Sequence, residues 1–177
     1  MKKRKRIAAG LVLLMLLHLF VGCASVRYDP TLYSYTNDWL DNAFLEENKI
    51  STAYYHNPDF TDFHGSEPKY IKYPDEPKTR TFIITEKEEY DRIFTKSPVE
   101  VDFEKEMVIL YTFCSVYYGG IKYELKTMKV TDDTLTVKFE CQYMPPDTDA
   151  ACQPYQRFFM LTMKKAEITK VKFEEMR

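Results

Sequence analysis

The sequence predicts an α+β fold, mainly antiparallel β sheet with one or two short helices. Residues 107–116 form a nearly continuous apolar run, which is typical of a central strand buried on both faces. Apolar and polar residues alternate over 121–126 and again over 135–141, with turn-forming residues at 131–133 between them. A helical pattern at 86–94 precedes these strands. A helix followed by successive antiparallel strands favours an α+β or mainly-β arrangement.

The first 22 residues are predicted to be an export signal. Residues 1–6 carry five basic side chains, and residues 7–21 form a mainly apolar stretch of 15 residues. That stretch is shorter than the roughly 20 apolar residues of a transmembrane helix, and it has the length of the apolar region of a signal peptide. The alternative is an uncleaved amino-terminal anchor.

The end of this segment resembles a bacterial lipobox, with Gly22 immediately before Cys23. In a lipobox the cysteine thiol is acylated and the chain is cut before it; Leu is usual where this chain has Phe20. The resemblance implies a bacterial lipoprotein with acyl chains such as palmitate on Cys23. Several acyl chains anchor a protein firmly, whereas one alone binds marginally. We therefore expect a lipid-anchored protein on the extracytoplasmic face of the cell membrane.

Charge and composition exclude several classes of function. After removal of residues 1–22 the chain keeps 20 basic and 27 acidic residues, a net charge of about −7. A basic surface for nucleic acid is therefore not expected, nor is a polybasic patch for anionic lipid. Gly65, Gly119 and Gly120 are the glycines that remain, and no glycine-rich phosphate loop is present in the sequence.

The amino-terminal part of the mature chain is the least regular. Residues 23–36 are interpreted as a tether that leads away from the lipid. Residues 37–48 have helical spacing of apolar side chains, with Asn37 or Thr36 as the N-cap. Residues 50–55 are predicted to be a short strand. The proline-rich stretch 56–80 is either a loop or an extended edge, and the packing of 37–80 against the core is left open.

Residues 81–177 are predicted to form an antiparallel β domain with one covering helix. Thr85 followed by Glu88 forms a capping box, so a helix is expected over 86–94. Pro98 then breaks the chain. Beyond the strands already described, 155–163 and 168–173 are expected to be strands. The apolar helix face comprises Tyr90, Ile93 and Phe94.

Three cysteines remain after Cys23. An exported protein can form disulfides, and a Cys141–Cys152 bridge would close the short loop 143–154. The alternative is that Cys114, Cys141 and Cys152 are reduced, buried core residues. No CxxC pair is present and the histidines are far away in sequence, so no metal site is expected.

Catalytic motifs and cofactor-binding motifs are both lacking. The serines have no nucleophile motif around them, and the paired acidic residues, such as Glu88 with Glu89, fall at helix surfaces, turns or the chain end. Solvated charge explains these pairs better than glycosidase chemistry. We therefore expect a protein that is not an enzyme and that needs no cofactor.

Two segments carry the residues best suited to binding. Tyr117 and Tyr118 stand beside the Gly119–Gly120 pair, and a second predicted loop has Tyr143 and Met144 before two prolines. Tyrosine and methionine are favoured at protein interfaces. The competing interpretation is that the tyrosines pack on the core and the glycines permit positive φ angles.

Residues 85–177 resemble the carboxy-terminal domain of the PrcB-like, protease-stabilising lipoproteins. The shared features are short motifs spread along this half of the chain. The family usually has Tyr after the glycine pair, where this chain has Ile121. The motifs are Glu88–Glu89–Tyr90, Val101–Asp102–Phe103, Gly119–Gly120, the charged alternating strand 122–130 and Pro154–Tyr155.

The resemblance implies a non-catalytic partner for another exported protein such as a protease. We therefore expect a membrane-anchored protein-interaction or protease-stabilising module, bound to the membrane through Cys23. The alternative is an extracytoplasmic receptor that binds a sugar or peptide through exposed tyrosines.

Overall fold

The structure is a computed structural model, and it describes residues 39–62, 64–96, 99–115, 122–142 and 154–176. Two short helices and eight strands are named within these ranges. In chain order they are α2 (Asn42–Glu47), β1 (Tyr55–His56), β2 (Tyr70–Ile71), β3 (Arg80–Ile84), α3 (Lys87–Ile93), β4 (Glu106–Ser115), β5 (Lys122–Thr131), β6 (Thr134–Gln142), β7 (Tyr155–Lys164) and β8 (Lys170–Met176).

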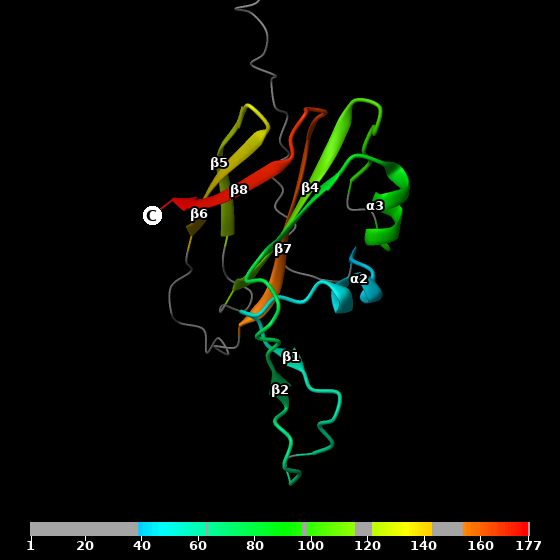
Figure 1. The fold of residues 1–177 in the computed structure, drawn as a ribbon, viewed down its shortest axis with the longest axis vertical. Helices are drawn as coiled ribbons and strands as arrows, with labels where there is room; N and C mark the ends of the chain where they lie inside the picture. The colour runs from blue at the N-terminus through cyan, green and yellow to red at the C-terminus, as the bar shows by residue number, and fades with distance from the viewer. Residues whose placement is uncertain (1–38, 63, 97–98, 116–121, 143–153, 177) are drawn as a thin grey trace, which may run out of the picture.

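The strands form two three-stranded sheets and one small hairpin. The first sheet has the order β3-β4-β7 with both pairings antiparallel, and the second has the order β5-β6-β8. In the second sheet β5 and β6 are antiparallel, but β6 and β8 run parallel. Among the described strands, β1 and β2 pair with each other alone, and they project beyond the sheets (Figure 1). The predicted α+β, mainly antiparallel fold is confirmed.

The two larger sheets enclose one part of the core between them. Met107 and Ile109 of β4 and Leu161 of β7 contact Leu135 and Val137 of β6 in one buried cluster. Aromatic residues fill the space nearer the start of β7. There the Phe159 ring lies 4.4 Å from Phe113, 4.9 Å from Tyr123 and 5.2 Å from Phe139, measured between centroids.

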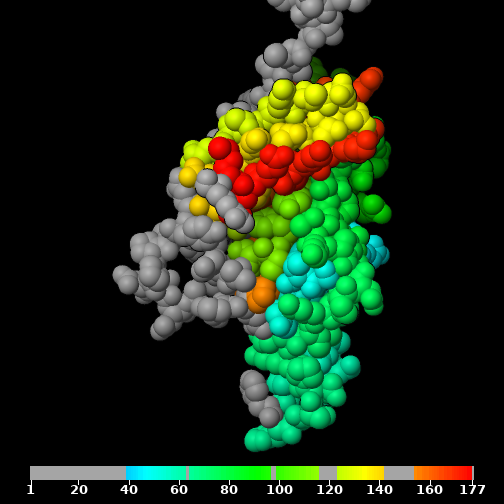
Figure 2. Space-filling view, turned by 60° about the vertical axis from the view of Figure 1, so that its left-hand side comes forward, coloured from blue at the N-terminus to red at the C-terminus, as the bar shows by residue number. Residues whose placement is uncertain are grey.

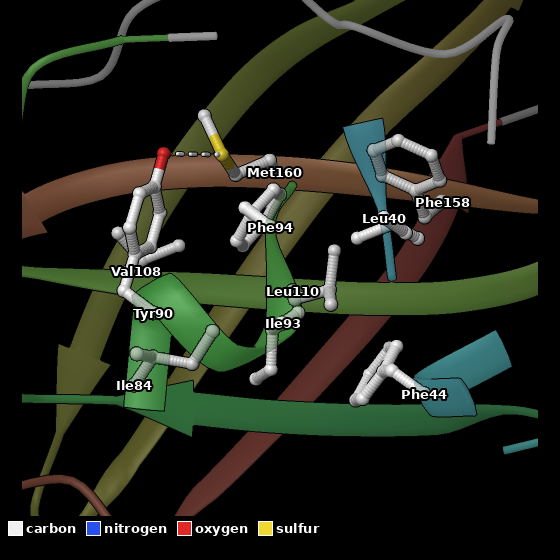
Figure 3. Close-up of a cluster of buried hydrophobic side chains, with 10 residues drawn as sticks. All are labelled: Leu40, Phe44, Ile84, Tyr90, Ile93, Phe94, Val108, Leu110, Phe158 and Met160. Carbon is white, nitrogen blue, oxygen red and sulfur yellow. Dashed lines mark hydrogen bonds between the residues drawn. The ribbon is translucent and has the colours of Figure 1, made fainter. Parts of the chain in front are cut away.

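The opposite face of the first sheet is covered by both helices (Figure 1). Phe44 of α2 packs edge-on against Phe82 of β3 at 5.0 Å between centroids. Tyr90 of α3 stacks on Phe94, and its hydroxyl lies 3.9 Å from the sulfur of Met160 (Figure 3). The first sheet is therefore the middle layer. This explains why β4 is apolar along most of its length, as the sequence predicted for a strand buried on both faces.

Both helices begin at residues other than those predicted. α2 begins at Asn42, and its N-cap is Asp41, whose carboxylate accepts hydrogen bonds from Ala43 N and Phe44 N at 2.9 and 3.1 Å. The expectation that the helix includes Leu40 is wrong, because Leu40 forms an isolated bridge with Phe94 instead. Leu40 and Phe44 are nevertheless buried, so this part of the chain belongs to the core.

The predicted capping box of α3 is also wrong. The helix begins at Lys87 with Glu86 at the N-cap position, and no side chain there accepts a capping hydrogen bond. The predicted apolar face is confirmed, since Tyr90, Ile93 and Phe94 are all buried. The helix is held by this packing rather than by its cap.

The predicted strand at 50–55 is mostly wrong. Ile50 and Ala53 are fully buried, but they lie in turns between α2 and β1, and the strand begins only at Tyr55. The stretch 56–80 contains β2, which pairs with β1 in the register Tyr55 to Ile71. It therefore includes a hairpin, and β3 begins at Arg80 at its end.

The β5–β6 hairpin follows the predicted pattern with one addition. Its turn contains Asp132, which has a φ of 54°, and Leu135, Val137 and Phe139 face inward as expected. The register shifts between Leu125 and Thr127, so Lys126 is an extra, bulged residue. Its ammonium group bonds Glu124 and Glu140 at 3.0 and 2.7 Å.

The last strand differs from the prediction in bounds and in direction. It covers Lys170–Met176 rather than 168–173, and it pairs with β6 in parallel. The connection from β7 passes from the first sheet to the second, with Ile168 buried on the way. Thr169 N and Lys170 N both donate to the carbonyl oxygen of Asp133, which fixes the start of β8 beside the β5–β6 turn.

Candidate functional site

All six residues predicted to bind a partner lie outside the described part of the chain. These are Tyr117, Tyr118, Gly119, Gly120, Tyr143 and Met144, and the same holds for Cys23 and Cys152. The Cys141–Cys152 pairing therefore stays a prediction. Cys141 itself is half-buried against the aromatic cluster around Phe159.

The described residues that flank the two predicted binding segments lie at one end of the sheets. Ser115, the last residue of β4, pairs with Tyr155, the first of β7. Lys122 at the start of β5 pairs with Gln142 at the end of β6. We call this the loop end and define it by these four residues. Both predicted segments therefore start and finish at the same end of the molecule.

A hydrogen bond joins the two sheets at the loop end. The hydroxyl of Tyr123 in β5 lies 3.2 Å from Oγ of Ser115 in β4. The Tyr123 ring also packs edge-on against Phe113 at 5.4 Å between centroids. Tyrosine supplies both the apolar contact and the polar link, which is its usual role at such a boundary.

The β1–β2 hairpin is attached to the same end (Figure 1). Tyr54 N donates to the carbonyl oxygen of Pro154 at 2.8 Å, and Cys114 Sγ lies 3.3 Å from the carbonyl oxygen of Thr52. The burial of the Cys114 thiol raises its pKa, although the contact with Thr52 opposes the shift. This thiol is held as a neutral packing group.

A network around Tyr55 fixes the base of the hairpin. Its hydroxyl oxygen lies 2.6 Å from Ile50 N and 2.8 Å from Oε1 of Gln156. The side-chain amide of Gln156 in turn donates to the carbonyl oxygen of Asn48 at 2.9 Å. Burial raises the pKa of Tyr55, so the phenol stays protonated and the turn after α2 is tied to β7.

A hollow of about 270 Å³ lies between the end of α2, the base of the hairpin and the start of β7. Aromatic side chains dominate its walls, and a carboxylate and an amide add polar groups. Its volume and composition fit a small ring or side chain better than an extended ligand. It is lined by Leu45, Glu46, Tyr54, Tyr55, His56, Tyr70, Tyr155 and Gln156.

Lysines lie over aromatic rings in and beside the hollow. Lys72 Nζ lies 4.4 Å from the centre of the Tyr54 ring, and Lys49 Nζ lies 4.2 Å from that of Tyr73. Lys49 also pairs with Glu46 at 2.6 Å. Burial alone would lower the pKa of Lys49, but hydrogen bonds to Glu46 and Tyr73 outweigh it and raise the pKa. Lys49 and Lys72 thus place cations over aromatic rings at the base of the hairpin.

The sequence prediction missed the hairpin tyrosines. The sequence alone does not indicate that Tyr54, Tyr55 and Tyr70 belong to a binding site, because the stretch between them has no clear periodicity. A usable signal was present, since tyrosines cluster on both sides of a turn-rich segment that contains Pro58, Gly65 and Pro68. If this stretch is interpreted as a hairpin, the tyrosines before the turn-rich segment and those after it are predicted to lie close together.

The described residues contain no group of three or more His, Cys, Asp or Glu side chains that could hold a metal ion. Within the same ranges, no helix is both long enough and apolar enough to span a membrane.

Comparison of the chain with family models, curated proteins and solved structures finds no match.

Proposed function

We propose that this chain is a lipid-anchored, non-catalytic protein-interaction module on the extracytoplasmic face of a bacterial membrane. The observation that carries the proposal is the loop end, where the flanks of both predicted binding segments and the attachment of the β1–β2 hairpin lie together. Three segments attached at one end of a sheet that is covered on both faces would share a rigid support. A protease is the first partner to test, since the PrcB-like resemblance implies one.

The anchoring part of the proposal rests on the signal sequence and Cys23. Cells that express the full chain and receive a palmitate analogue should incorporate it, and the protein should remain with the membranes after high-salt washing. The Cys23→Ala variant should lose the label and leave the membrane fraction. Equal labelling of both proteins would contradict acylation at Cys23.

The interaction part is tested by affinity capture of the full chain from its native membranes after crosslinking. We expect one exported protein to be enriched with the wild type and lost with the double variant Tyr117→Ala/Tyr118→Ala. The melting temperature of the double variant should stay near that of the wild type. If the variant unfolds instead, the tyrosines are core residues and this part of the proposal fails.

If the captured protein is a protease, its half-life in the cell should fall when this chain is deleted. Restoring the wild-type chain should restore the half-life, whereas the double variant should not. If the abundance of the partner does not change when this chain is deleted, the chain binds the partner but does not stabilise it.

The hollow at the hairpin base supports a second candidate function, that of a receptor for a sugar or a peptide. Tyr54, Tyr70 and Tyr155 offer aromatic surface on which a sugar ring or a peptide side chain can stack. A ligand that binds the folded chain and not the unfolded one raises its melting temperature, and the rise grows with the logarithm of the ligand concentration once the site is saturated. Thermal-shift measurements with glycan fragments and short peptides test this, with Tyr70→Ala as the variant in which the shift should disappear.

A further inference from the structure

Strand β8 forms an outer edge of the second sheet. Among the strands that the structure describes, its neighbour is β6 on one side and none on the other. Figure 2 shows β8 in red, running along the surface of the molecule. An edge strand of this kind presents unpaired backbone N–H and C=O groups to an incoming strand.

The charges along β8 change sign from its beginning to its end. Lys170 and Lys172 are exposed in the first half, and Glu174 and Glu175 are exposed in the second half. A row of lysines alone would repel a second copy of the same strand, which is how edges are commonly protected. A strand with lysines first and glutamates last instead complements itself when it runs antiparallel.

The charge pattern of β8 favours one register for antiparallel pairing of two copies of this strand. Antiparallel pairing centred on Phe173 places Lys172 of each chain opposite Glu174 of the other, which gives two attractive pairs on the solvent face. Centring the pairing on Lys172 or on Glu174 would place like charges opposite each other. The Phe173 register is therefore the one that the charges favour.

The inner face of β8 supports the same register. Phe173 is half-buried and stacks on Tyr111 at 3.9 Å between ring centroids. Centring on Phe173 brings this residue next to its own copy at the two-fold axis. The inner surface of the second sheet would then continue across the junction, with Phe173 beside its copy and Val171 opposite Glu175.

We propose that two copies of this chain associate through antiparallel β8–β8 pairing centred on Phe173. The two second sheets join into one sheet of six strands. The interface is isologous, so it closes as a symmetric dimer and leaves no further edge of this kind.

The test is charge reversal on the full chain in mild detergent, with association measured by sedimentation at several concentrations. Lys172→Glu and Glu174→Lys should each weaken dimerisation about tenfold, since each converts two attractive cross-strand pairs into repulsive ones. The combined variant Lys172→Glu/Glu174→Lys should recover the dimer, because the pairs are restored with opposite sign. Lys129→Glu, on the other edge strand β5, is the matched control and should associate like the wild type.

Glu174 also pairs with Lys138 of its own chain at 3.2 Å, so Glu174→Lys alone affects the fold as well. A second measurement therefore uses disulfide trapping in the membrane. Differently tagged Lys172→Cys and Glu174→Cys chains, expressed together, should form a mixed disulfide, whereas Lys129→Cys with Glu174→Cys should not. A monomeric wild type, or a dimer insensitive to both single reversals and not trapped by this cysteine pair, would overturn the proposal.

Discussion

The hydroxyl of Tyr55 lies 2.8 Å from Oε1 of Gln156 and links two residues that are 101 positions apart in the chain. The same oxygen accepts a hydrogen bond from the fully buried Ile50 backbone at 2.6 Å. One phenol thus accepts the hydrogen bond of a backbone N–H in the turn after α2 and joins this turn to the start of β7.

Replacing Tyr55 with Phe should lower the free energy of unfolding by about 1–3 kcal/mol, because the buried Ile50 N–H would lose its acceptor. Denaturant unfolding followed by circular dichroism measures the loss. Tyr54→Phe is the matched control, since the Tyr54 hydroxyl makes no hydrogen bond within the described residues. Equal losses in the two variants would show that the network around Tyr55 contributes little.

Leu40 should be essential for stability although it lies outside regular structure. It is 3% exposed and packs with Phe44 against the first sheet. Leu40→Ala should therefore reduce the free energy of unfolding by about 2–5 kcal/mol, as expected for a buried leucine. Leu45→Ala, at a half-buried position of α2, should have a smaller effect. A negligible loss at Leu40 would mean that this segment is not part of the cooperative core.

The strands that the sequence predicted correctly are those for which burial alone decides the structure. β4 is apolar on both faces because it lies in the middle layer, and Leu135, Val137 and Phe139 alternate because β6 has one buried face. Burial of Ile50 was mistaken for burial in a strand, but Ile50 lies at a turn, where its backbone N–H donates to the hydroxyl of Tyr55. Apolar pattern cannot reveal such a partner.

The direction of β8 could not be predicted for a different reason. Alternation along Lys170–Met176 indicates which face is buried, but it does not identify the neighbouring strand or its direction. The parallel pairing with β6 follows from a connection that leaves β7 in one sheet and enters the other. Likewise the hollow depends on Tyr54 and Tyr70, which only the hairpin brings together.

The turn between β5 and β6 should make stability depend on pH. Hydrogen bonds from the Thr169 and Thr134 hydroxyls lower the pKa of Asp133. A carboxyl group with a depressed folded-state pKa stabilises the fold above its unfolded-state pKa, about 3.9, and this stabilisation disappears as the pH falls through the folded-state pKa. Asp133→Asn should therefore destabilise the chain at pH 7 and much less at pH 2.

A double-mutant cycle isolates this effect. The coupling between Asp133→Asn and Thr169→Val, measured by denaturant unfolding, should be favourable at pH 7 and shrink at pH 2. Coupling that is the same at both pH values would contradict the assigned role of the Asp133 carboxylate.

The Cys114 thiol should react slowly with alkylating reagents in the folded chain. Burial raises its pKa, so little of the reactive thiolate forms near neutral pH. Peptide-level mass spectrometry after timed iodoacetamide treatment can follow this residue separately from the other cysteines. Denatured protein supplies the reference rate. Labelling of Cys114 as fast in the folded chain as in the denatured one would show that its sulfur is not protected.

The bulge at Lys126 has a consequence for how β5 can vary. It changes the phase of the strand, so that Tyr123 and Leu125 face the core before it, and Met128 and Val130 face the core after it. Deleting Lys126 would leave one residue between Leu125 and Met128, so plain alternation would keep both pairs facing the core. Substitutions at outward-facing positions of β5 are tolerable and the alternation does not require the bulged residue, but loss of Glu124 or Lys129 would place one member of a buried pair on the outer face.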